Sequence, residues 1–216
     1  GTPIMRLAAA SLLVLLTAGT AFADDGARLT GIPAALLSGA AAEGTQHEIP
    51  NPPAPTIAAG PATIILGQTP LGDLHDAFGG TLHHATDGVA SADWLCYQLD
   101  NGGETQLVWF VSDGQSGGDS KVVTLVAAAA AQPSPVCDAP ANGLASPKPA
   151  KPMPGLGGSL ADLEKAYGPV SPRDGMVAYI NQGAAMKSGF TTFQSINYLL
   201  SGDAITAFGA SQISVP

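Results

Sequence analysis

The predicted fold rests on two similar stretches of sequence, residues 71–79 (LGDLHDAFG) and residues 160–168 (LADLEKAYG). The two stretches align without gaps and share the pattern L-x-D-L-x-x-A-[FY]-G. The leucines and the aromatic residue of the pattern lie at positions i, i+3 and i+7, which form one face of a short helix. The final glycine stands where a helix commonly ends in a left-handed conformation. We therefore expect two copies of one structural unit, each opening with a brief helix.

Both expected helices carry start signals. Thr69 and Pro70 offer an N-cap followed by proline at the first helical position. Ser159 and Asp162 have the spacing of a capping box. The residues that carry the shared pattern are Leu71, Asp73, Leu74, Phe78 and Gly79 in the first copy, and Leu160, Asp162, Leu163, Tyr167 and Gly168 in the second.

Runs of β-forming residues follow each helix. The expected strands are residues 93–99, 105–111 and 121–126 in the first copy, and 176–180, 190–200 and 204–208 in the second. The sequence thus predicts an α+β fold of two tandem repeats, residues 63–131 and 155–216. Each repeat is a short helical segment packed on a three- to four-stranded antiparallel sheet. Residues 107–111 are apolar on both faces, so we expect the face without a helix to meet the other unit or a partner.

Two segments lie outside the repeats. Residues 24–62 are rich in Pro, Ala and Gly and are interpreted as a flexible or extended lead-in, within which residues 29–37 either make one helical turn or dock as an arm. Residues 132–154 contain seven prolines, which excludes a helix or a central strand, and are interpreted as a linker.

This doubled arrangement of a short helix, the L-x-D-L-x-x-A-[FY]-G pattern and an antiparallel meander resembles a known fold. It is similar to the tandem fold of β-lactamase-inhibitor-like proteins and to the single-unit BamE-like domains of outer-membrane assembly. The resemblance implies the helix-plus-sheet fold and a binding role, as an inhibitor or an assembly factor. It differs in two respects: the chain has no lipobox cysteine, and each unit holds at most one cysteine, where the inhibitors have a disulfide in each unit.

Export is predicted from the first residues. An apolar run, residues 7–17, follows Arg6, and Ala21 and Ala23 give the small-x-small pattern of a signal-peptidase site. This run is too short to span a hydrocarbon layer of about 30 Å, so we expect residues 1–23 to be a signal peptide. No later run reaches spanning length, so we expect a periplasmic or secreted protein with no membrane span in its mature form.

The cysteines and the charge add to this picture. Two cysteines in an exported protein predict one disulfide, Cys96–Cys137. The formal net charge is −9, with only 8 Lys and Arg residues, which argues against nucleic acid as a partner.

The densest aromatic group is Trp94, Tyr97, Trp109 and Phe110. Core packing is the ordinary interpretation of such a group. Because aromatic residues are scarce in this chain, at 6%, their concentration on one predicted sheet makes it the candidate binding surface. We expect Trp94 or Trp109 to lie on a sheet face open to a partner.

No motif predicts catalysis or metal binding. Gly114–Gly118 matches G-x-S-x-G around Ser116, but no His follows His84 and the next run is β-forming, so a flexible turn is expected. His75, His83 and His84 lack metal-ligand spacing, and residues 113–119 lack the final acid of a calcium loop. We expect no catalytic residue, no metal and no cofactor.

The sequence therefore favours an exported, non-catalytic binding protein of the bacterial envelope that engages a protein partner through a sheet face. The partner would be another envelope protein or an enzyme that the chain inhibits. Two alternatives stay open: a hydrolytic enzyme with a carboxylate or serine site, and a structural component of the envelope.

Overall fold

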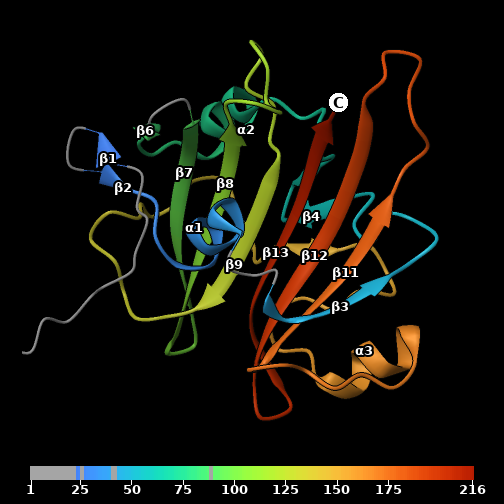
Figure 1. Cartoon of the computed structure of the whole chain (residues 1–216). Helices are drawn as coiled ribbons and strands as arrows, with labels where there is room; N and C mark the ends of the chain where they lie inside the picture. The colour runs from blue at the N-terminus through green and yellow to red at the C-terminus, as the bar shows by residue number, and fades with distance from the viewer. Residues whose placement is uncertain (1–22, 25–26, 40–42, 88–89) are drawn as a thin grey trace, which may run out of the picture.

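A computed structural model describes residues 23–24, 27–39, 43–87 and 90–216 (Figure 1). Except for Ala23, the predicted signal peptide lies outside these residues. The described helices are α1 (Gly31–Ser38), α2 (Leu71–Phe78) and α3 (Leu160–Tyr167). The described strands are β1 (Ala23–Asp24), β2 (Ala27–Arg28), β3 (Thr45–Glu48), β4 (Ile57–Ala59), β5 (Ala62–Ile64), β6 (His83–Asp87), β7 (Ala90–Asn101), β8 (Glu104–Asp113), β9 (Leu125–Ala130), β10 (Lys148–Pro149), β11 (Met176–Gln182), β12 (Thr191–Ser201) and β13 (Ala204–Val215).

The predicted α+β class is confirmed, but one sheet replaces the two that were expected. Eight strands follow one another in the order β3-β11-β12-β13-β9-β8-β7-β6. All neighbours are antiparallel except β3 and β11, which are parallel. The strands of the two predicted units meet where β9 pairs with β13, with Ala127 opposite Gly209. Because backbone hydrogen bonds cross this boundary, the sheet is continuous through both units (Figure 1).

The two predicted helices form where the pattern places them. Ser159 Oγ accepts a hydrogen bond from the Asp162 amide at 3.3 Å and Asp162 Oδ2 accepts from the Ser159 amide at 2.9 Å, which confirms the capping box. The expected Thr69 cap is wrong: Pro70 is the N-cap residue, and Thr69 Oγ1 instead accepts from the Ile65 amide at 2.9 Å.

Both helices end at a glycine with positive φ, as expected, although not in the left-handed helical region. Gly79 has φ 73° and ψ −152°, and Gly168 has φ 85° and ψ −176°. These values belong to a region that essentially only glycine occupies. A side chain at either position would therefore force the chain to leave its helix in another direction.

The predicted third strand of the first unit is displaced along the chain. Residues 121–126 were expected, whereas β9 runs from Leu125 to Ala130. Lys121 and Val122 instead meet the start of α2: the Leu71 amide donates to the Lys121 carbonyl at 2.9 Å, and Val122 bridges Pro70. The four alanines of β9 have low β-propensity, which is why the pattern placed the strand too early.

One face of the large sheet, here called the helix face, carries a continuous core. α2, α3 and the small sheet β10-β4-β5 bring Leu74, Leu163 and Ile57 onto residues from both halves of the sheet. The predicted linker packs here as well, because Leu144 and Met153 are buried in this core and β10 pairs with β4.

Two sets of three aromatic rings lie on this face, and all of them are buried except Tyr167, which is 37% exposed. In the first half, Tyr97 meets Phe78 and Phe110 with ring centroids 6.3 and 6.1 Å apart. In the second half, Tyr179 meets Tyr167 and Tyr198 at 5.0 and 6.5 Å. Burial raises the pKa of Tyr97 and of Tyr179 to about 12.

The hydroxyl groups of the two central tyrosines differ. Tyr97 Oη donates to the carbonyl of Gly79 at 2.7 Å. Tyr179 Oη is buried and has no hydrogen-bond partner among the described residues, although Gly168 ends α3 as Gly79 ends α2.

The other face of the sheet is covered only in part, by the segment expected to be a lead-in. This segment is ordered where it is described: α1 docks on β9 and β13, and β3 adds an edge strand beside β11 (Figure 1). Small residues permit the docking, since a side chain at Gly209 would collide with Leu36 of α1.

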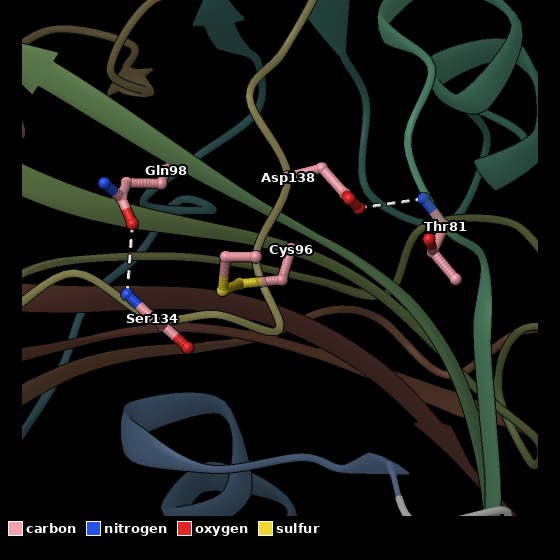
Figure 2. The surroundings of a disulfide bond; sticks show 6 residues. Thr81, Cys96, Gln98, Ser134 and Asp138 are labelled. Atoms are coloured by element: carbon pink, nitrogen blue, oxygen red, sulfur yellow. Dashed lines mark hydrogen bonds between the residues drawn. A yellow bond between two sulfur atoms is a disulfide. The ribbon is translucent and has the colours of Figure 1, made fainter.

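The predicted disulfide between Cys96 and Cys137 is confirmed, and Figure 2 shows how it fastens the chain that follows β9 to β7. Asp138 accepts from the Thr81 amide at 2.8 Å, and Gln98 Oε1 accepts from the Ser134 amide at 3.0 Å. The backbone amide of Asp138 donates to the Cys96 carbonyl, and the backbone amide of Gln98 donates to the Asp138 carbonyl, both at 2.9 Å. The segment around Asp138 therefore pairs with β7 past the point where the pairing of β6 with β7 ends.

We predict that the Cys96→Ala/Cys137→Ala variant loses about 4 kcal/mol of unfolding free energy, because the bond closes a loop of 41 residues. Urea unfolding measures this loss, and the wild-type protein in reductant should match the variant. A loss below about 1 kcal/mol would show that the packed linker holds the segment without the bond.

We also predict that Tyr97→Phe and Tyr179→Phe differ in stability. Tyr97→Phe removes a buried hydrogen bond and should cost about 1 kcal/mol, whereas Tyr179→Phe removes an unpaired hydroxyl and should be neutral or stabilising. Each variant serves as the control for the other in urea unfolding. Equal losses would contradict the assignment.

Candidate binding surface

The structure corrects the expected aromatic surface. Trp94 and Trp109 are 3% and 5% exposed and lie beneath Leu29 and Ile32. Tyr97 and Phe110 point to the opposite, helix face and are fully buried. The four residues therefore do not form one open surface, because the lead-in covers the indoles and the core takes up the other two rings.

α1 is too small to cover its whole face of the sheet. Eight strands at their usual spacing span about 34 Å, whereas a helix of eight residues is about 12 Å long. α1 lies over the middle of the sheet, near β9, and Figure 1 shows β11, β12 and the upper part of β13 beside it without a covering element.

We call the uncovered surface of β11, β12 and β13 the open face. Strand alternation and register place these residues on it: Ile180, Phe193, Ser195, Asn197, Ser211, Ile213 and Val215. Ala178 has the same orientation but is only 2% exposed. The centre of the open face is polar, with Ser195 Oγ and Ser211 Oγ 3.1 Å apart. Its end is apolar, because Phe193 lies opposite Ile213, which is 44% exposed, and Val215 is 37% exposed.

Two hollows lie where α1 meets the open face. The larger, of about 200 Å³, has Leu36 and Leu37 of α1 on one side and Ile180 and Ile213 on the other. The smaller, of about 180 Å³, lies between Ile32 and Met176. Asn197 lines both, so the hollows adjoin one another along β12.

The best-defined charge cluster lies on the helix face, away from the open face. The carboxylate of Asp93 is 8% exposed and accepts from His84 Nδ1 at 3.0 Å and from Lys121 Nζ at 3.2 Å. The side chains of His84 and Lys121 are about half exposed, so the cluster lies at the margin of the core. No hydrogen bond between described residues joins it to Ser116.

The other predicted motifs are structural or unconnected. The Asp113 carboxylate accepts from the amides of Gln115 and Ser116 at 3.0 and 2.8 Å, which makes this stretch a side-chain-capped turn. His75 bonds the Gly80 carbonyl, and His83 stacks on Trp94. Within the described part of the chain, no three His, Cys, Asp or Glu side chains form a group that could hold a metal ion.

Two features kept the open-face residues from being predicted. The last strand was expected to end at residue 208, whereas β13 continues to Val215. No pattern in the sequence indicates which half of the sheet α1 covers. The available signal was the apolar, β-branched pair Ile213 and Val215 separated by Ser214, which alternates as a strand does.

Comparison of the chain with protein-family models, curated proteins and solved structures finds no match. Among the described helices, none has the length and apolar character needed to cross a membrane.

For the charge cluster, we predict that Lys121→Met costs about 1–2 kcal/mol of unfolding free energy, because it removes the lysine cation from the buried Asp93 carboxylate and leaves only the hydrogen bond with His84. Lys187→Met, an exposed lysine outside any described ion pair, should change stability by less than about 0.5 kcal/mol. Equal effects of the two changes would show that Asp93 does not depend on Lys121.

Proposed function

We propose that this chain is an exported, non-catalytic binding protein of the bacterial envelope that engages a protein partner through the open face. One observation carries the proposal: large apolar side chains, among them Ile213 at 44% exposure, border a hollow at the edge of α1, where the described elements leave the sheet face uncovered. Contiguous exposed apolar surface of this kind is typical of interaction sites.

The chemistry of the hollows supports binding over turnover. Asp113 is the one ionisable side chain among the described residues that line the larger hollow, and its carboxylate is already bonded to two amides of its own turn. The Asp113 carboxylate therefore has a structural role in its turn. No second ionisable side chain among the described lining residues could act with it as an acid–base pair. The Cys96–Cys137 disulfide supports an oxidising, extracytoplasmic location.

We propose further that the two halves descend from one duplicated unit, as in the tandem fold of β-lactamase-inhibitor-like proteins, with each half similar to a single BamE-like domain. The aromatic sets support this, because Phe110 pairs with Leu95 as Tyr198 pairs with Val177. The helix starts also support it: Pro70 bridges Val122 just before β9, and Ser159 bridges Ala204 at the start of β13. Under this proposal the chain acts as an inhibitor or an assembly factor.

Site-specific photo-crosslinking in the producing cell tests the binding role. A photoreactive amino acid at Ile213 should give a discrete crosslinked product with another protein. The same amino acid at Asp76, exposed on α2, is the matched control and should give none. Products from both positions, or from neither, would contradict a partner on the open face.

A further inference from the structure

The open face is polar at its centre, apolar at its end and acidic at its margin. Glu43 lines the smaller hollow and Asp113 the larger. Glu48 of β3 lies beside Ile180 in the parallel pair and therefore shares its face. Three carboxylates thus stand around one surface, on three different segments of the chain.

No described cation neutralises these carboxylates. Among the described residues, the basic side chains in contact with a carboxylate are Lys121 and His84, and both contact Asp93 on the helix face. The residues that define the open face include no Lys, Arg or His, and the whole chain has a formal charge of −9. The surface therefore presents uncompensated negative charge beside exposed apolar side chains.

From this arrangement we infer that the open face binds a segment of a protein partner in which Lys or Arg stands beside apolar side chains. The inference rests on the proposed function and specifies the partner. Apolar side chains of the segment would enter the hollow between Leu36 and Ile213, and the cations would meet Glu43, Glu48 and Asp113 at its margin. Opposite charge also accelerates the encounter of the two proteins.

The charge disfavours other occupants. In a two-fold dimer the same surface meets itself, which would bring acidic margins together. Anionic lipid surfaces and nucleic acids carry the same sign as the open face and would be repelled. A protein segment with both basic and apolar side chains complements the apolar hollow and the acidic margin of the open face.

A peptide library displayed on phage, selected against the immobilised protein, provides the probe. Enriched peptides should carry Lys or Arg next to apolar residues. At low salt, their Kd should rise about tenfold for Glu43→Gln/Glu48→Gln. The matched control, Asp76→Asn/Glu104→Gln, removes the same charge from exposed positions off the open face and should leave Kd unchanged.

A further variant separates the inference from the function on which it rests. Ile213→Ser alters the apolar end without changing charge and should also weaken binding. If peptides without Lys or Arg are enriched, and Ile213→Ser alone weakens them, the charge inference is overturned and the proposed function stands. If no peptide is enriched, or Ile213→Ser leaves Kd unchanged, both are overturned.

Discussion

The antiparallel pairing of β9 with β13 is the contact on which the rest of the structure depends. It joins the last strand of each half, from Leu125 opposite Ser211 to Ala129 opposite Ala207. Without it each half would be a small sheet with an open edge, a form that readily pairs with other chains. With it, Phe110, Val126, Phe208 and Tyr198 share one core. On the opposite face the same pair presents Ala127 and Gly209, whose small size lets α1 approach the sheet.

Local signals accounted for much of the fold. The spacing of Leu71, Leu74 and Phe78 predicted α2, and the Ser159–Asp162 pair predicted the start of α3, because both depend on residues within one or two turns. Alternation and turn residues also predicted the long strands β7, β8, β11 and β12 and the first part of β13, but not the shorter strands β1 to β6 and β10. The third strand was misplaced because a run of alanines has little β-propensity of its own and is extended here through its neighbours β8 and β13.

Long-range contacts could not be predicted in this way. β3 pairs with β11 across most of the chain, with Thr45 beside Val177. α1, GIPAALLS, is apolar on nearly every side and so gives no amphipathic pattern that would identify the surface it covers. For the same reason the sequence could not show that Trp94 and Trp109 would be covered while Ile213 would be left exposed.

Among the described residues, α1 covers only part of one sheet face, so the two halves of the sheet differ in what lies over them. On the helix face, register matches Phe110 with Tyr198 and Tyr97 with Tyr179, and each of these positions is aromatic and buried. Trp109 precedes Phe110 and Asn197 precedes Tyr198, so these two residues hold matching positions on the opposite face. Ile32 and Leu29 cover Trp109, whereas Asn197 lines the hollows. The covered position is therefore large and apolar, and the uncovered one is polar, as burial requires.

Ile213 and Val215 do not follow this rule. With Phe110 and Tyr198 matched, β9 and β13 correspond from Leu125 and Ala207 onward, and β9 ends at Ala130 while β13 continues to Val215. Neither residue has a counterpart in a strand of the first half. A matching buried position in the first half therefore does not explain why they are apolar. Exposed apolar side chains that add nothing to the core are the surface on which the proposed binding role rests.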